Sequence, residues 1–422
     1  MKILICLYSI NNYGGITTYV EELNRGLRSL GHSADLMLLA ETDRKPYTKR
    51  HSKRPGNFES SWDGFSANPD TGWGGVPVWS YANLARIKEF RKHAKKYDLV
   101  IWGVPVPSWS KLHLVPSWPS LYRMDVPQIA IIHDGNFRYL YPHLNHVAPY
   151  LKGVACVHGA AYASAEMFDG AYSLVPNPHP WRIRTVAWED KRPTIVATHM
   201  WKGWKHMEVA VKVAPYLTRS RLILGGDGIE RRYMTSPTKC PAKYDGLWEA
   251  MESSGRAKFV DILAQPELWK TYDNSRVMFD PSYSKNYNTM GAHFNRSVFE
   301  AYNAGMVPVV MEQNMNLPGI FENRKTHLGI PAGSSIKKIA RLLEEAVHLP
   351  AERSEKIVQA GRRLIKKHFY RDVVAQGLID LSFGEPCGLF NRVDQGEPSK
   401  RMSAATQSIL DGNRPKDRVL KS

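Results

Sequence analysis

The chain has 422 residues, of which 43% are hydrophobic, and this is enough apolar material for two ordinary domains, each with its own core. The formal net charge of +17 favours a polyanionic partner, either nucleic acid or an anionic membrane surface, with simple solubility as the alternative. No stretch approaches the ~20 unbroken apolar residues of a membrane span, so we expect no integral membrane segment. The start lacks the pattern of a signal peptide, and the four cysteines form no C-x-x-C pair. Both observations favour a cytoplasmic protein with reduced thiols.

The first half alternates short apolar strands with helical stretches. We expect a helix at residues 16–30 and strands at residues 2–7, 33–40, 97–104, 128–134, 153–159 and 171–178. Strand–helix–strand alternation implies right-handed crossovers and a parallel, doubly wound sheet, which is an α/β fold. Residues 41–80 interrupt the pattern with a polar insertion rich in Pro, Gly and Trp. A loop of this length is usually functional or disordered.

A Pro- and Trp-rich crossing at residues 176–184 is typical of a linker, and the alternation restarts after it. We expect strands at residues 193–198, 220–228, 257–263, 277–282 and 307–312, helices at residues 206–217, 266–275 and 297–305, and an amphipathic run at residues 335–369. The sequence thus predicts two Rossmann-like domains at residues 1–180 and 181–370, with ligands bound at the carboxyl ends of their strands. Residues 371–383 are expected to pack back on the first domain. Residues 384–422 are expected to form a flexible tail.

Two short runs in the first half place polar or flexible residues directly after apolar strands. Gly14 and Gly15 precede the first helix, where glycines let backbone N–H groups approach a phosphate at the positive helix end. His133 and Asp134 follow a buried strand, where either side chain can steady a substrate oxygen or a developing positive charge. The structural alternative for the two glycines is a tight turn. The alternative for His133 and Asp134 is a histidine packed in the core followed by an aspartate that caps the backbone. Without a G-x-G-x-x-G or Walker pattern, no dinucleotide or P-loop site is expected.

The stretch HMWKGWKHM, at residues 199–207, lies between a strand and a helix of the predicted second domain. Lys202 and Lys205 in this stretch could neutralise a diphosphate leaving group without a metal ion. Trp201 and Trp204 are expected only to wall the cleft. The two histidines lack the i, i+4 spacing and the carboxylate neighbours of a metal site, so no metal is predicted.

The run at residues 285–310 joins a glycine-containing loop to a helix and then to a buried strand. The start of this helix could hold a phosphate, and Glu300, about one turn further on, could accept from two adjacent hydroxyls of a ribose. The loop residues Gly291, Ala292 and His293 would then cover the phosphates. An ordinary strand–helix–strand unit with a surface glutamate is the structural alternative.

Taken in order along residues 1–370, these features resemble the retaining glycosyltransferases of the GT-B fold, glycosyltransferase family 4 in general. That family has a Gly-Gly turn, a His-Asp pair after a central strand, a cationic diphosphate clamp and a Glu-x7-Glu motif before a Gly-x-Pro-Val strand. The run FEAYNAGMVPVV, at residues 299–310, is the most specific match. The resemblance implies a nucleotide-sugar donor held by the second domain, with the leaving diphosphate helping to deprotonate the acceptor. It implies no protein nucleophile, no metal and no cofactor.

A closer likeness is to the DNA α-glucosyltransferases of T-even phages, which open their second domain with a Met-Trp-Lys-Gly run. It agrees with the positive charge, because such an enzyme must hold duplex DNA. Two positions depart from the family pattern. The first Glu of the pair falls at Ala292, and an expected arginine falls near Ala197. Lys205 is the expected substitute for this arginine, although a lysine cannot reproduce a bidentate fork.

We therefore expect a phage-type DNA glycosyltransferase that transfers a hexose, glucose from UDP-glucose, to a hydroxymethylated pyrimidine of double-stranded DNA, with the base leaving the stack. His133 and Asp134 would face the sugar and the acceptor hydroxyl. The expected DNA-phosphate contacts lie in two basic runs: Arg44, Lys45, Lys49, Arg50, Lys53, Arg54, Arg91 and Lys92. Two alternatives stay open, namely a family 4-like enzyme for an envelope glycan or lipid-linked acceptor, and a catalytically silent nucleotide-sugar- or DNA-binding protein. The sequence carries no signal for an oligomeric state.

Overall fold

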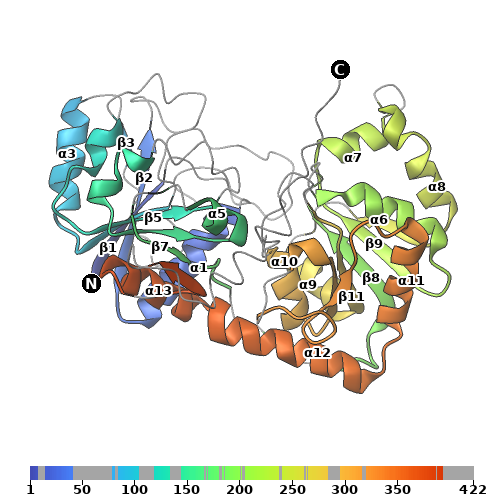
Figure 1. Cartoon of the computed structure of the whole chain (residues 1–422). Coiled ribbons are helices and arrows are strands. Elements are labelled where there is room, and N and C mark those ends of the chain that lie inside the picture. The colour runs from blue at the N-terminus through green and yellow to red at the C-terminus, as the bar shows by residue number, and fades with distance from the viewer. Residues whose placement is uncertain are drawn as a thin grey trace, which may run out of the picture. The chain divides into compact units, whose positions relative to one another are not determined.

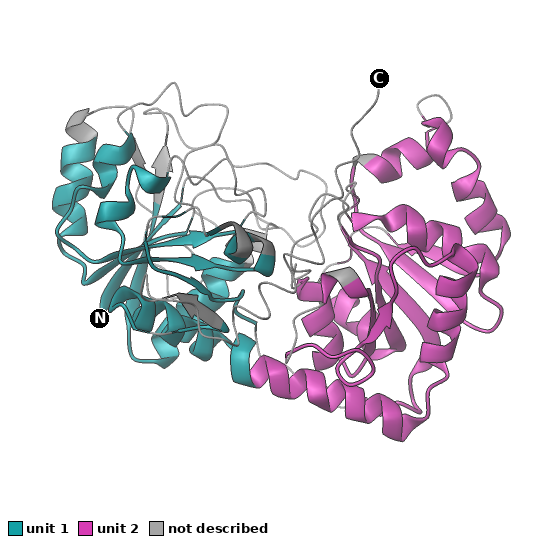
Figure 2. Cartoon of the chain, in the orientation of Figure 1, with its two compact units in different colours: residues 1–53, 57–180, 367–408 teal, residues 54–56, 181–366, 409–422 magenta. Residues whose placement is uncertain are grey.

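The computed structural model of the chain divides into two compact units (Figure 2). It describes residues 1–7, 15–40, 78–80, 84–103, 118–133, 144–165, 168, 170–179, 183–184, 186–199, 201, 205–236, 240–260, 263, 265–283, 295–315, 320–385 and 387–392. Among these, unit 1 holds the residues up to 179 and those from 367 onward, and unit 2 holds 183–366. The chain therefore leaves unit 1, builds unit 2 and returns to unit 1, crossing at residues 180–181 and 366–367.

Unit 1 is built on an eight-stranded sheet in the order β14-β7-β6-β5-β4-β1-β2-β3 (Figure 1). Its strands are β1 (Lys2–Leu7), β2 (Ser33–Ala40), β3 (Val78–Ser80), β4 (Leu99–Trp102), β5 (Gln128–Ile132), β6 (Gly153–Cys156), β7 (Tyr172–Leu174) and β14 (Phe390–Arg392). Seven of them run parallel, and β14 pairs antiparallel with β7. Two edge strands differ from the sequence expectation, because β3 lies inside the expected insertion and β14 inside the expected tail.

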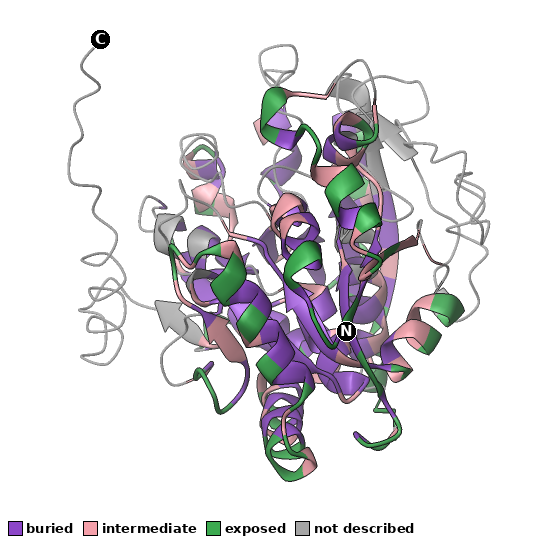
Figure 3. Ribbon diagram, turned by 90° about the vertical axis from the view of Figure 1, so that its right-hand side faces the viewer, coloured by how far each residue is buried: buried purple, intermediate pink, exposed green. Residues whose placement is uncertain are grey.

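The helices of unit 1 cover both faces of this sheet. They are α1 (Gly15–Ser29), α3 (Leu84–Ala94), α5 (Gly159–Ser164) and α13 (Arg371–Ser382). Apolar residues of α1 and α13 share one core cluster with Ile3, Ile5 and Leu7 of β1, which alternate along the strand as a period of two requires. On the other face Trp102 stacks on Tyr122 at 4.0 Å. Across the chain, Figure 3 shows most strand residues as buried and the exposed residues mainly on helices and loops.

Unit 2 is built on a six-stranded parallel sheet in the order β10-β9-β8-β11-β12-β13. Its strands are β8 (Arg192–Thr198), β9 (Arg221–Gly225), β10 (Ala257–Val260), β11 (Ser275–Asp280), β12 (Val307–Met311) and β13 (Leu328–Ile330). Its helices are α6 (Met207–Val213), α7 (Ile229–Met234), α8 (Leu247–Ser253), α9 (Gln265–Asp273), α10 (Arg296–Asn303), α11 (Ile336–Val347) and α12 (Ala351–Leu364). Each unit is thus a doubly wound α/β layer structure, which confirms the predicted fold class.

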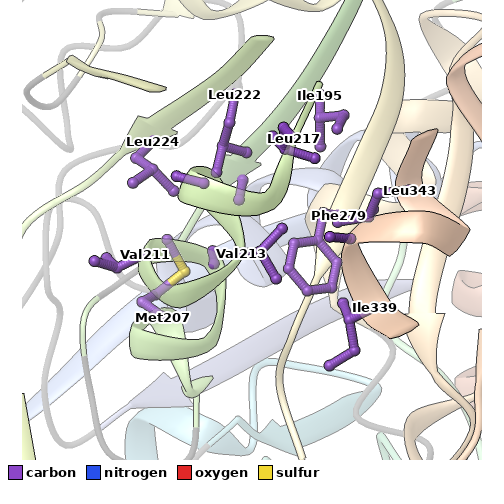
Figure 4. Packing of buried hydrophobic residues seen from close by; sticks show 14 of the residues in the cluster. Ile195, Met207, Val211, Val213, Leu217, Leu222, Leu224, Phe279, Ile339 and Leu343 are labelled. Atoms are coloured by element: carbon purple, nitrogen blue, oxygen red, sulfur yellow. The ribbon is translucent and has the colours of Figure 1, made fainter. Parts of the chain in front are cut away.

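The core of unit 2 lies between the sheet and the helices α6 and α11 (Figure 4). Phe279 of β11 packs among aliphatic side chains that include Val213 and Leu343. The expected helical run at residues 335–369 is broken, because Pro350 cannot continue a helix and instead stands at the N-cap of α12. A π-helical turn, Ile365–Phe369, then ends α12 where the chain returns to unit 1. In the part of the chain that the structure describes, no helix combines the length and apolar character needed to cross a membrane.

Candidate functional site

The strand order of unit 2 reverses at β8, which has β9 on one side and β11 on the other. In open parallel sheets, ligands bind outside the carboxyl ends of the strands at such a switch point. Two polar residues stand there, since Thr198 ends β8 and Asp280 ends β11. Helix α10 follows β11 in the chain, so its N-terminus belongs to the same edge of the sheet.

A chain of hydrogen bonds links this edge to the start of α10. The ammonium of Lys205 donates to Oδ1 of Asn295, and Nδ2 of Asn295 donates to Oδ2 of Asp280. The backbone N–H of Ser282 donates to the other carboxylate oxygen of Asp280 at 3.0 Å. Asn295 stands at the N-cap of α10, yet its side chain makes no cap bond there. The first turn of α10 is therefore left without a cap from Asn295, while an ammonium lies beside it.

His199 completes the cluster from the loop after β8. Its Nε2 lies 3.6 Å from Oδ1 of Asp280, and its Nδ1 lies 3.5 Å from Oγ of Ser297, in the first turn of α10. Burial lowers the pKa of His199, and the neighbouring Asp280 only partly offsets this. Burial acts to raise the pKa of Asp280, but His199, Lys205 and two hydrogen bonds hold it below its usual range. The cluster thus keeps a carboxylate balanced by one ammonium beside the N-terminus of α10, the end of a helix that favours anions.

Glu300 lies one turn into α10, with a side chain that is 12% exposed. Its Oε1 accepts a hydrogen bond of 2.8 Å from Nε of Arg296. Burial and, secondarily, the charge of Glu300 raise the pKa of Tyr272, whose hydroxyl lies 2.7 Å from Oγ1 of Thr198 at the end of β8. The structure therefore places Glu300 near the same strand ends, with part of its carboxylate engaged by Arg296.

Two glycines after β9 shape the loop that contains Trp201. A Cβ atom on Gly226 would lie 2.0 Å from the carbonyl oxygen of His199, and one on Gly228 would lie 2.1 Å from that of Trp201. Trp201 is fully buried and its indole N–H donates to the carbonyl of Gly225 at 3.3 Å. The expectation that Trp201 walls a cleft was wrong, because its ring packs into the core of unit 2. Trp204 lies outside the described residues.

The strand order of unit 1 reverses between β1 and β4, and β5 lies next to β4. His133 directly follows β5, and its ring meets Tyr19 of α1 edge to face, with centroids 4.6 Å apart. Burial lowers the pKa of His133 to about 4, although a hydrogen bond to the backbone of Gly103 acts in the opposite direction. Among the described residues, Nε2 of His133 and the hydroxyl of Tyr19 have no hydrogen-bond partner. His133 is thus a neutral, enclosed imidazole at the carboxyl edge of the sheet.

Many of the predicted site residues fall outside the described part of the chain. These are Asp134, Gly14, Lys202, Gly291, Ala292, His293, Arg44, Lys45, Lys49, Arg50, Lys53 and Arg54. Gly15 is described as the first residue of α1. Arg91 and Lys92 lie in the last turn of α3, where Arg91 is half-buried and Lys92 is exposed. Lys205 and Glu300 lie in unit 2, and His133 lies in unit 1.

The sequence reasoning missed four members of the unit 2 cluster: His199, Asp280, Asn295 and Ser297. Position alone could have indicated two of them, because an aspartate ends a buried strand and an asparagine directly precedes a helix. Ala197, where the family resemblance implies an arginine, is fully buried and belongs to the unit 2 core. A guanidinium there would lie among apolar side chains. In the described ranges no group of three or more His, Cys, Asp or Glu side chains could hold a metal ion.

Comparison with known proteins agrees with this architecture. A family model described as "Glycosyl transferase-like" matches residues 216–379. Anabaena HepE in complex with UDP and glucose superimposes with a TM-score of 0.62 at 13% identity, covering 90% of this chain and 98% of that one. Sucrose-phosphate synthase from Thermosynechococcus elongatus gives 0.60 at 14% identity, covering 90% and 98%. The lipopolysaccharide outer core galactosyltransferase WaaB gives 0.59 at 13% identity, covering 91% and 99%.

No curated protein matches the chain in sequence. The structural likenesses, at these low identities, establish the fold, which is the GT-B fold. Together with the matched domain, they place the chain in the glycosyltransferase class of enzymes.

Proposed function

We propose that the protein is a UDP-sugar-dependent glycosyltransferase that works in the cytoplasm and holds its donor in unit 2. The observation that carries this proposal is the Lys205–Asn295–Asp280 hydrogen-bond chain at the α10 N-terminus, because it sets an ammonium beside a helix start that an anion can occupy. The similar fold of Anabaena HepE, crystallised with UDP-glucose, supports a uridine diphosphate donor. Glucose is the sugar that we propose.

In the proposed reaction, the bond between the sugar and the diphosphate breaks and the acceptor oxygen joins the same face of the sugar. Lys202 and Lys205 neutralise the charge that develops on the leaving diphosphate, and Gly14 and Gly15 are proposed as further donor-binding residues. The departing phosphate oxygen takes the acceptor proton, so no protein nucleophile is needed. Glu300 accepts hydrogen bonds from the ribose hydroxyls. For this it would exchange the hydrogen bond from Arg296 for one from the ligand.

Gly291, Ala292 and His293 are proposed to cover the phosphates, and His133 and Asp134 to face the sugar and the acceptor hydroxyl. A neutral imidazole suits this role, because it can donate to or accept from a hydroxyl without adding charge. The burial of its Nε2 atom means that the ring must become accessible when substrate binds.

For the acceptor, we propose a hydroxymethylated pyrimidine in double-stranded DNA. The net charge of +17 supports it, as does α3, which carries exposed Lys88 and Lys92. The six basic residues between Arg44 and Arg54 are proposed as further phosphate contacts. The second candidate is an envelope glycan or lipid-linked acceptor, favoured by the fold shared with the galactosyltransferase WaaB.

A donor–acceptor matrix separates these two acceptors. Purified protein is given UDP-glucose with hydroxymethylated duplex DNA, unmodified DNA or lipid-linked glycan, and the products are examined by mass spectrometry of digested nucleosides and of lipids. Sugar on the modified nucleoside supports the DNA acceptor, and sugar only on glycan or lipid refutes it. Tight DNA binding without release of UDP from any pair would identify a catalytically silent binding protein.

The donor clamp is tested by replacing Lys202 with Ala. We expect a severe loss of turnover, about 100-fold, because one cation beside the leaving diphosphate is removed. Steady-state kinetics with UDP-glucose measures it, and Lys258→Ala, an exposed lysine of β10, is the matched control. Normal turnover in the Lys202 variant would refute the clamp.

A further inference from the structure

The side chain of Asn295 belongs to the hydrogen-bond chain on which the proposed function rests, but its conformation is unusual for its position at a helix start. An asparagine at an N-cap ordinarily accepts a hydrogen bond from the first turn of its own helix. Here the amide instead joins Lys205 to Asp280 and leaves α10 without its cap. The Asn295 side chain thus gives up a capping hydrogen bond, which would stabilise the start of the helix. It makes hydrogen bonds to two charged groups instead.

We infer that Asn295 is a positioning residue, anchored by Asp280, which holds the Lys205 ammonium at the N-terminus of α10 as a cation of the donor diphosphate site. The inference rests on the proposed nucleotide-sugar donor. It assigns to Asn295 and Asp280 a role in donor affinity that acts entirely through Lys205.

The geometry explains why the anchor must be rigid. Asp280 is 1% exposed, it ends a central strand, and its second carboxylate oxygen is fixed by the backbone N–H of Ser282. It therefore orients the Asn295 amide so that Nδ2 faces the carboxylate and Oδ1 faces the ammonium. Lys205 is 8% exposed, so its flexible stem is packed and its ammonium is directed by this acceptor. A lysine held in this way loses less side-chain freedom when an anion arrives.

The charges of the cluster fit the same role. His199, neutralised by burial, adds no positive charge that would compete for Asp280. The carboxylate of Asp280 makes it possible to bury the ammonium, because a buried cation needs a counter-charge. The asparagine between them keeps the ammonium away from a direct ion pair. The positive charge of Lys205 thus stays beside the start of α10, where a donor phosphate would bind.

A serine at position 295 separates positioning from simple helix stability. Serine is a strong N-cap residue, so Asn295→Ser should restore the cap of α10 and leave the melting temperature within a few degrees of wild type. Its short side chain cannot bridge Lys205 and Asp280. We expect the affinity for UDP, measured by titration calorimetry, to fall about tenfold, because the ammonium loses its anchor. In turnover, the KM for the sugar donor should rise while the KM for the acceptor stays unchanged.

A double-mutant cycle then tests whether Asn295 acts through Lys205. Lys205→Ala should weaken UDP binding at least as much as Asn295→Ser, and the double variant should bind no more weakly than Lys205→Ala alone. Asn323→Ala is the matched control, because Asn323 bridges Glu312 and the backbone of Gly329 elsewhere in unit 2. Its UDP affinity should equal that of wild type.

The outcomes that overturn the inference differ from those that overturn the proposed function. Wild-type affinity in Asn295→Ser, or losses that add fully in the double variant, would show that Asn295 does not position Lys205 while leaving the donor assignment intact. Failure of the wild-type protein to bind UDP would refute the donor assignment and this inference together.

Discussion

At the residue scale, the contrast between His133 and His199 shows how burial decides what an imidazole can do. Among the described residues, His133 contacts the ring of Tyr19 and the backbone of Gly103, and burial lowers its pKa to about 4. His199 is buried and has Asp280 at 3.6 Å, which partly restores its affinity for a proton. We expect His133 to act as a neutral hydrogen-bonding group throughout the physiological pH range.

The imidazole of His133, whose Nε2 atom is buried, also makes the stability of the fold depend on pH. Its folded-state pKa of about 4 lies below the unfolded value, which is roughly 6.5. As pH falls from 6.5 towards 4, the unfolded chain takes up a proton that the folded chain does not, so the free energy of unfolding decreases. Between pH 7 and pH 5 this single group should cost about 2 kcal/mol.

Denaturant unfolding of wild type and His133→Gln at both pH values measures this contribution. The variant should lose about 2 kcal/mol less than wild type between pH 7 and pH 5. His146→Gln, at an exposed position of unit 1, serves as the control and should keep the wild-type dependence. Identical pH dependence in wild type and His133→Gln would show that the imidazole is not buried neutral.

At the scale of elements, the approach of the β9–α7 loop to the loop after β8 depends on glycine. Gly226 has a φ of +110°, and a Cβ there would lie 2.0 Å from the carbonyl oxygen of His199. Gly226→Ala should therefore lower the free energy of unfolding by about 3 kcal/mol or more, from backbone strain and a main-chain clash. Gly255 has a φ of +63° with open space around it, and Gly255→Ala should cost only about 1 kcal/mol. Equal losses in the two variants, measured by denaturant titration, would contradict the clash.

The central strands could be predicted from the sequence, because they are continuous apolar runs bounded by polar or glycine residues. The expected strand at residues 33–40 coincides with β2, and the expected helix at residues 16–30 coincides with α1 to within one residue. The short edge strands could not be predicted. β3 and β14 have three residues each, and pairing with a neighbour decides their conformation more than their own sequence does.

The unit 2 cluster was only partly predictable for a similar reason. Glu300 and Lys205 stood out by residue type within a recognisable motif. Asn295 and Asp280 are separated by fifteen positions in the sequence, and no periodicity indicates that their side chains bond. Their relation depends on the path of the chain between β11 and α10, and that path is a tertiary property.

At the scale of the whole molecule, the positive charge gives a test of the DNA proposal through α3. Lys88 and Lys92 are exposed one turn apart on this helix. If both contact DNA phosphates, replacing them with Ala should weaken binding to all sequences alike. The slope of log affinity against log salt should also fall by about 2. Fluorescence anisotropy with duplex DNA at several salt concentrations measures both effects.

The control for this test carries the same change in net charge. Lys337 and Lys338 are exposed on α11 of unit 2, and their replacement with Ala should leave the salt slope as in wild type. Equal slopes in all three proteins would exclude α3 from the DNA contact. If the protein binds anionic vesicles with a steep salt dependence but does not bind DNA in this way, the result would favour the membrane-associated acceptor.

Unit 1 is assembled from both ends of the chain, and this has a consequence for its synthesis. Val374 and Leu378 of α13 lie in the same core cluster as β1 and α1, and β14 pairs with β7 at the edge of the sheet. The ribosome therefore synthesises most of unit 1 first. Helix α13 follows only after residues 183–366 of unit 2 have been synthesised. Until then the apolar face of α1 lacks its partner helix. The described residues of unit 2 all lie between 183 and 366, so this part of the chain can fold earlier. Unit 1 is thus the unit whose translation begins first and whose folding is completed last. We expect nascent chains that stall before residue 371 to be the form that needs a chaperone.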